Sequence, residues 1–236
     1  MDTISYIILV PMVYLAIAVC LGGIVIRLAI LIRRPKQTST LMVYPAKKPA
    51  WAYTLYDTFL LPSVRKHTPV LWVFLMAFHV CLLLLLLGHL ELIGDFRPLW
   101  FYDHEIFLGG GFVGLILAIC LIFFLFRRFH SPVREISVPE DYYLLLLLLL
   151  VVVFGAEMDW ARNWYGYGEM TPDDYREYLG SLIRFAPELP YAVTASGHRF
   201  MLVLHVLLAN LFLMVLPFTK IMHAFLALPV NKLRRG

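Results

Sequence analysis

Long apolar stretches alternate with short polar segments along this chain of 236 residues. A helix needs about 20 consecutive apolar residues to cross the roughly 30 Å hydrocarbon core of a bilayer. Five stretches reach or approach that length, and the pattern predicts five transmembrane helices. They cover residues 5–32, 70–94, 106–126, 142–158 and 198–228. The fourth is short but contains seven consecutive leucines that begin at Leu144.

The composition is that of a membrane protein. Hydrophobic residues make up 61% of the chain and charged residues 15%, and the mean hydropathy is +0.78. Soluble domains are about half apolar and a quarter charged. The longest segments between the spans, 33–69 and 159–197, are too short for a separate soluble domain. We therefore predict one all-α integral membrane domain that covers residues 1–236.

Two local signals refine this prediction. Met1 and Asp2 lack the positive charges of a signal peptide, and the following apolar run is too long for one, so the first span is expected to be a retained anchor. Within segment 159–197, Thr171 stands before Pro172 and an aspartate, which is a helix-start signal. A short helix is therefore expected over residues 172–182.

Basic and acidic residues collect in different segments between the spans. Lys and Arg accumulate on the cytoplasmic side of membrane proteins. The basic group is Arg33, Arg34, Lys36, Lys47, Lys48, Arg65, Lys66, Arg127, Arg128, Arg134, Lys232, Arg234 and Arg235. The acidic group is Asp95, Asp103, Glu105, Asp159, Glu169, Asp173, Asp174, Glu177 and Glu188. This asymmetry predicts an outer N-terminus and a cytoplasmic C-terminus. It also accounts for the net charge of +4 without a nucleic-acid partner.

Two predicted spans each carry two histidines deep inside an apolar stretch. His79 and His89 lie in the second span, and His205 and His223 in the fifth. An ionisable or metal-binding side chain inside a span is costly and normally has a functional partner there. If the two helices are antiparallel neighbours, His89 meets His205 nearer the exterior and His79 meets His223 nearer the cytoplasm. The pattern predicts two bis-histidine sites stacked across the bilayer.

Helix geometry supports this pairing without proving it. Ten residues of helix rise about 15 Å and eighteen about 27 Å, so the two separations match only if tilt or a kink at Pro217 reduces the difference. On a continuous helix His205 and His223 share one face, whereas His79 and His89 are offset by about 80°. The alternative is that each histidine is an interhelical hydrogen-bond contact, which is common for a single intramembrane histidine. Four histidines at matched depths make that alternative weaker.

Two histidines per metal favour haem iron over zinc. Histidine is a common axial ligand of haem iron, and two of them fill both axial positions, which favours electron transfer over oxygen binding. A structural zinc normally has four protein ligands, with thiolates close in sequence, and the chain offers no such pattern. Small residues that suit the neighbourhood of a flat macrocycle are Gly88, Gly109, Gly110, Gly111 and Gly114.

Longer motifs around the histidines resemble the membrane cytochrome b (gamma) subunit of respiratory nitrate reductase. Residues 78–89 have that family's ten-residue histidine spacing, with a glycine before the second histidine. Residues 216–223, Leu-Pro-Phe-Thr-Lys-Ile-Met-His, are similar to its P-F-S/T-K/R-x-x-H motif, and His205 stands at its eighteen-residue spacing. Residues 127–134 look like its inner loop. The resemblance covers roughly residues 70–230.

The resemblance implies a dihaem b-type cytochrome in the inner membrane of a prokaryote. It would pass electrons between the quinone/quinol pool, with menaquinone or another quinone as substrate, and a cytoplasmic iron–sulfur subunit of an anaerobic respiratory complex. Further membrane and multihaem cytochrome subunits are implied as partners. By the same resemblance His89 and His205 would hold the outer haem b and His79 and His223 the inner one. Arg128 would be a candidate partner of a haem propionate, with an ordinary inner-face anchor as the alternative.

The sequence departs from the nitrate reductase pattern at the quinol pocket. The family's lysine near the start of the third span has no counterpart in residues 101–104, and His104, with Gly88, is the substitute we expect to contact the quinone. Residues 57–62 and 141–143 look more like the DsrM-type cytochrome of the sulfite-reduction electron-transfer complex, and we favour that branch. Candidate proton acceptors near the outer face are Glu91, His104, Glu157 and Asp159, each with an interfacial polar group as the alternative.

Two other classes of function compete with this interpretation. A transporter could use the histidines to relay protons or to bind a cation, although such folds tend to have inverted repeats and broken helices, and neither is visible in the sequence. A haemless membrane anchor for a soluble enzyme is the other. No catalytic triad, nucleotide loop or iron–sulfur cysteine pattern is present, so chemistry at the terminal acceptor would belong to a partner.

Overall fold

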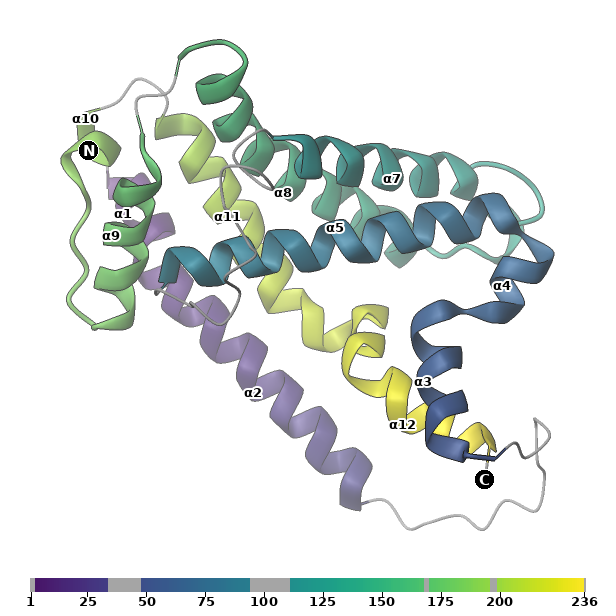
Figure 1. Ribbon diagram of the computed structural model, residues 1–236. Helices are drawn as coiled ribbons and strands as arrows, with labels where there is room; N and C mark the ends of the chain where they lie inside the picture. The colour runs from purple at the N-terminus through teal and green to yellow at the C-terminus, as the bar shows by residue number, and fades with distance from the viewer. Residues whose placement is uncertain (1–2, 34–47, 94–110, 168–169, 196–198, 236) are drawn as a thin grey trace. The chain divides into compact units, whose positions relative to one another are not determined.

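The computed structural model describes residues 3–33, 48–93, 111–167, 170–195 and 199–235, and throughout these ranges the regular secondary structure is helical (Figure 1). The α-helices in chain order are α1 Thr3–Leu9, α2 Pro11–Arg33, α3 Ala50–Leu60, α4 Pro62–His67, α5 Pro69–Ile93, α7 Phe112–Arg128, α8 Pro139–Asn163, α9 Pro172–Ile183, α10 Tyr191–Ala195, α11 Arg199–Val215 and α12 His223–Arg235. Short 3₁₀ turns occupy Arg134–Ile136 (η2), Leu216–Phe218 (η3) and Lys220–Met222 (η4).

Four stretches of the described residues are long and apolar enough to cross a membrane. They are Thr3–Arg33, Pro69–Ile93, Pro139–Asn163 and Arg199–Phe218. The prediction of an all-helical, multi-pass membrane protein is thus confirmed. The apolar α7 corresponds to the third predicted span, but it has 17 residues and the expected start at 106–110 lies outside the described residues. The count of five spans stays a prediction.

The chain divides into two compact units, which we describe separately. The first comprises Met1–Ala16 and Ala77–Phe212, and the second Ile17–Met76 and Leu213–Gly236. Whether they form one membrane domain over residues 1–236 stays a prediction.

In the first unit, α7 and α8 pack closely against one another. The buried side chains of this core include Leu117 and Leu121 from α7 and Val152 from α8. Gly114 permits the close approach, because a Cβ added there would lie 2.6 Å from the Cβ of Ala156. Gly114 therefore serves the packing of α7 on α8, and its place beside a macrocycle stays a prediction.

The short helix predicted in segment 159–197 is present as α9, one residue longer than expected. Thr171 is its N-cap, and Asp174 closes a capping box with it: the Thr171 backbone N–H donates to Asp174 Oδ2 at 2.7 Å. The inner face of α9 is apolar and buried in a second core with α1. Two tyrosine hydroxyls secure this contact: Tyr178 donates to the carbonyl of Leu9 at 2.6 Å, and Tyr14 to the carbonyl of Leu182 at 2.8 Å.

The second unit contains a break that changes the fifth predicted span. The span was expected to run as one helix over 198–228, but α11 ends at Val215, and two 3₁₀ turns separate it from α12. Pro217 has no backbone N–H to continue the helix, and Thr219 is extended, with its hydroxyl accepting from the N–H of Ile221 at 3.4 Å. The kink expected at Pro217 is confirmed. The expectation that His205 and His223 share a face assumed a continuous helix, and the break removes that premise.

The same break corrects a second expectation, that the chain shows no broken helix. Segment 33–69 also holds more structure than its sequence suggested, since α3 and α4 lie within it. α3 packs on α12, and Asn231 Nδ2 donates to Thr58 Oγ1 at 2.9 Å. The second unit is built from α2 after Ala16, the α3–α4 pair, the start of α5 and α12, and Gly23 of α2 lies against Pro217.

Candidate metal centre

The structure brings His89 of α5 and His205 of α11 face to face within the first unit. Their imidazole ring centroids are 6.1 Å apart, and the ring planes are inclined by only 26°. This neighbour relation is the one expected from the sequence for the outer histidine pair.

Hydrogen bonds orient both rings through the same nitrogen. His89 Nδ1 lies 2.7 Å from the carbonyl oxygen of Leu85, and His205 Nδ1 lies 2.9 Å from that of Val151. A carbonyl oxygen only accepts, so each neutral ring must carry its proton on Nδ1. The lone pair is then on Nε2 in both histidines, so Nε2 is the ring nitrogen that can bind a metal.

Two adjacent imidazole rings whose Nε2 atoms carry lone pairs offer two nitrogen donors to a metal. Among the described residues, no three His, Cys, Asp or Glu side chains gather closely enough to hold a metal. A donor set of two histidines suits a metal whose other ligands come from a macrocycle, as in haem.

Gly155 of α8 lies directly against the His205 ring. A Cβ added at this glycine would be 2.7 Å from His205 Cε1 and 2.9 Å from Nδ1. Val151, whose carbonyl accepts from the ring, lies one helical turn before Gly155. Helix α8 therefore both admits the imidazole and fixes its orientation. We did not single out Gly155 from the sequence, although it is the one glycine within the fourth span. Gly88, the residue before His89, is buried.

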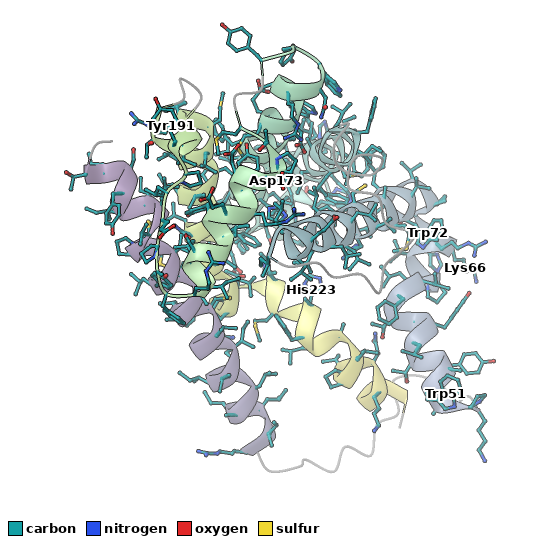
Figure 2. All side chains as sticks on the ribbon, turned by 60° about the vertical axis from the view of Figure 1, so that its left-hand side comes forward. Trp51, Lys66, Trp72, Asp173, Tyr191 and His223 are labelled. Carbon is teal, nitrogen blue, oxygen red and sulfur yellow. The ribbon has the colours of Figure 1, made fainter. Side chains whose placement is uncertain are left out.

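The other two span histidines belong to different units. The ring of His79 on α5 is perpendicular to that of Phe78, with centroids 5.1 Å apart. His223 begins α12 in the second unit, and its Nδ1 lies 2.9 Å from the carbonyl of Lys220 (Figure 2). Like His89 and His205, His223 thus has an Nδ1 contact with a backbone carbonyl. The pairing of His79 with His223 stays a prediction, and His104, Gly109 and Gly110 lie outside the described residues.

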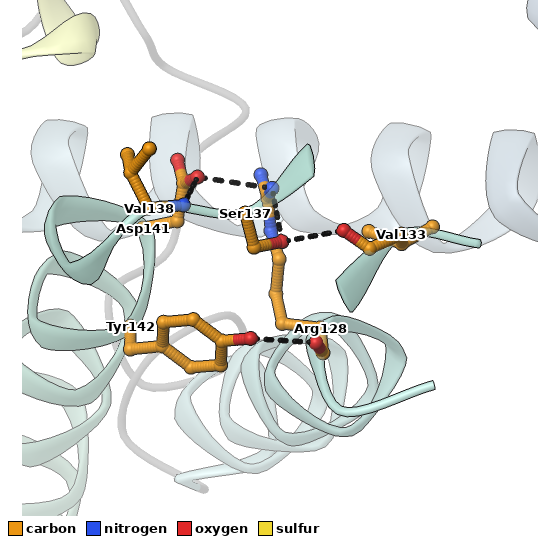
Figure 3. A network of polar contacts seen from close by, with 6 residues as sticks. All are labelled: Arg128, Val133, Ser137, Val138, Asp141 and Tyr142. Carbon is orange, nitrogen blue, oxygen red and sulfur yellow. Dashed lines mark hydrogen bonds and ion pairs between the residues drawn. The ribbon is translucent and has the colours of Figure 1, made fainter. Parts of the chain in front are cut away.

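Arg128 takes part in a polar network at the α7–α8 connection (Figure 3). Its Nη1 lies 3.2 Å from Asp141 Oδ2 and donates to Ser137 Oγ at 3.1 Å. The same Asp141 oxygen accepts from the N–H of Val138 at 3.0 Å, and Tyr142 donates to the carbonyl of Arg128 at 2.8 Å. The Asp141 side chain is only 5% exposed. Asp141 and Tyr142 therefore stabilise the connection between α7 and α8. The role of Arg128 beside a haem propionate stays a prediction.

Two neighbouring histidines between apolar helices are a feature that membrane cytochromes b share. Comparison with protein families agrees: residues 63–236 match the nitrate reductase gamma subunit family. The match covers most of the chain, including all four span histidines, and the chain belongs to this family. A search of curated proteins finds no match. Membership indicates a membrane cytochrome b subunit of a respiratory complex, in a family that binds haem b and associates with other subunits in the membrane.

Proposed function

We propose that the chain is a dihaem b-type cytochrome that passes electrons between the membrane quinone pool and a cytoplasmic iron–sulfur subunit. The observation that carries the proposal is the His89–His205 pair: two rings with centroids 6.1 Å apart, each with Nδ1 on a backbone carbonyl. His79 and His223 are proposed to hold the second haem. When bound, the haems supply one-electron carriers that connect the two faces of the membrane.

The proposed topology has five spans, an outer N-terminus and a cytoplasmic C-terminus in a prokaryotic inner membrane. The separation of basic from acidic segments supports this orientation. It places the His89–His205 pair nearer the exterior. A quinol bound there, beside Gly88 and His104, would lose two electrons and two protons and become a quinone. Glu91, Glu157 and Asp159 are candidate acceptors that direct the protons outward.

The cytoplasmic partner is proposed to dock on the basic inner face. Residues 57–62 and 141–143, which resemble the DsrM-type cytochrome, support a complex of sulfur metabolism with further membrane and multihaem cytochrome subunits. Part of that resemblance has a structural explanation, since Asp141 and Tyr142 close the α7–α8 connection. The alternative is the gamma subunit of a nitrate reductase, which the matched family favours. The proteins that copurify distinguish the two: a multihaem cytochrome supports the first, and a molybdenum enzyme the second.

One structural feature favours a different class of function. The break between α11 and α12 at residues 216–222 is the kind of discontinuity that transporters use to build ion sites. A haemless transporter or anchor predicts a colourless protein. The dihaem cytochrome predicts a red protein with a reducible b-type spectrum and two haems per chain.

Single histidine variants test the ligand assignment. His89→Ala and His205→Ala should remove the same spectral component, and His79→Ala and His223→Ala should remove the other. His130→Ala is the matched control, because its Nδ1 also contacts the carbonyl four residues earlier, that of Phe126 at 2.9 Å, but it lies outside the spans. This control should keep both components. Identical losses from His79→Ala and His89→Ala would refute the pairing.

A further inference from the structure

Helix α3 has its apolar side outward. Five of its large apolar or aromatic side chains are exposed: Trp51 by 69%, Phe59 by 61%, Leu60 by 46%, Tyr56 by 43% and Leu55 by 41%. Residues 51, 55 and 59 follow the i, i+4, i+8 spacing of a single helical stripe. The polar side faces the protein instead. Thr54 is buried, and Thr58 accepts from Asn231 of α12.

Helix α9, another short helix of the chain, has its apolar side inward and its polar side outward. On α9, Tyr178 and Leu182 are buried in a core, while Asp173 on the other side has 86% of its side chain exposed. α9 thus has the apolar-in, polar-out pattern of a helix in water. α3 has the reverse pattern. With 11 residues it is about 16 Å long, which is too short to cross a bilayer.

Contacts with the spanning helix α5 place the end of α3 at the edge of the membrane. Trp72, in the first turn of α5, donates from its indole Nε1 to the carbonyl of Leu60, the last residue of α3, at 2.7 Å (Figure 2). The Arg65 guanidinium of α4 lies over the same indole, 5.5 Å from the ring centroid. Leu61 makes the turn between α3 and α4 with a left-handed φ of 45°. The segment is therefore fastened to the start of a span.

Charge and residue type indicate what covers the exposed stripe. Tryptophan and tyrosine are enriched where membrane proteins meet lipid headgroups. In residues 48–68 the basic side chains are Lys48, Arg65 and Lys66, and Asp57 is the single acid. Basic residues beside an amphipathic helix favour anionic phospholipid. A protein partner in water would have to cover this mostly apolar stripe, on a segment that is bonded to the start of a span.

We propose that α3 lies in the membrane interface as an amphipathic anchor, with Trp51, Leu55 and Phe59 among the lipid chains and Lys48, Arg65 and Lys66 at anionic headgroups. Segment 48–68 is then part of the membrane surface and not a free loop. α3 would hold α12, to which Thr58 is bonded, at the same level. The proposal depends neither on the haems nor on the direction of electron flow.

A fluorescence experiment on the full chain in nanodiscs that contain anionic phosphatidylglycerol tests this proposal. Cys20, Cys81 and Cys120, all buried, are replaced by alanine, and bimane is attached to a single cysteine at position 51 or 59. Val73→Cys on α5 is the lipid reference, and Asp173→Cys is the water reference. Bimane at position 51 or 59 should be quenched by doxyl-labelled lipid, and its quenching by iodide should be as weak as that of bimane at position 73. Iodide quenching equal to that at position 173, without quenching by doxyl lipid, would overturn the proposal and indicate a face that docks a protein.

Tryptophan fluorescence provides a second measurement that needs no cysteine changes. The wild-type chain and Trp51→Phe, which keeps an apolar ring, are compared in nanodiscs of ordinary and brominated lipid. The wild type should have a lipid-quenched component that the variant lacks. Equal quenching of the two proteins would contradict the proposal. The haem spectrum should be the same in both, which keeps this test separate from that of the proposed function.

Discussion

Replacing Gly155 by alanine should disturb the His205 ring while leaving the fold intact. The added Cβ would lie 2.7 Å from His205 Cε1, whereas ordinary contacts begin at 3.4 Å. The ring would have to move by 0.7 Å, the difference between these two distances, to restore an ordinary contact. Both Gly155 and Val151 belong to α8, so a ring pushed away from one also leaves the other. The hydrogen bond from Nδ1 to the Val151 carbonyl, now 2.9 Å, is then stretched or lost.

The cost has two parts. Inserting a methyl group into a packed site costs about 1–3 kcal/mol, and a lost hydrogen bond about 0.5–1.5 kcal/mol. For metal sites, removing an interaction that orients a ligand typically lowers metal affinity about 10–100-fold. Gly155→Ala should therefore lose the haem that we propose for His89 and His205, or shift its reduction potential, and retain the second proposed haem.

The assay is haem content per chain together with a redox titration of the b-type spectrum. Gly22→Ala is the matched control, because a Cβ at this glycine of α2 would meet nothing within 4 Å. The control should keep both haems and both potentials. If Gly155→Ala also keeps two haems with unchanged potentials, the His205 ring does not depend on α8 as we describe.

Three further predictions concern the stability of the parts around the site. Thr171→Ala removes the N-cap of α9 and should destabilise that helix by about 1 kcal/mol, seen as faster amide exchange in α9. Asp141→Ala leaves the Arg128 guanidinium without its buried partner and should lower the melting temperature by far more than Asp173→Ala, which breaks an exposed ion pair. Equal shifts of the melting temperature in the two variants would contradict a stabilising role of the Arg128 network. Burial raises the pKa of Tyr175 to about 12 from its usual 10, so the stability that the neutral Tyr175 side chain gives α9 should be complete below pH 10 and fall as the pH rises towards 12. Tyrosinate absorbance, followed together with amide exchange in α9, measures this. Titration of all tyrosines near pH 10 would contradict the burial of Tyr175.

Hydropathy and local signals predicted much of the architecture because they act along the chain. The apolar runs at 70–94 and 142–158 became α5 and α8, and the Thr171 signal became the α9 cap. Pro217 correctly indicated a kink. The extent of the break was not predictable, because it depends on the extended Thr219 and on the contact between Pro217 and Gly23 far away in the sequence.

The candidate site was also predictable only in part, because it depends on contacts between residues that are far apart in the sequence. The unusual cost of histidine inside apolar spans drew attention to His89 and His205 from sequence alone. The supporting residues carry no such signal. Gly155 matters only because α8 passes beside His205, and Asp141 only because the chain turns back on itself after Arg128. Likewise, the outward stripe of α3 could be recognised only once α12 was seen to occupy its polar side.

An experimental density map of the purified chain at side-chain resolution tests the central claim most directly. The account predicts flat, iron-centred density between α5 and α11, with the imidazole rings of His89 and His205 on opposite sides of the metal and Gly155 against the second ring. Continuous side-chain packing between these two helices, or a metal bound to only one of the two histidines, would contradict it.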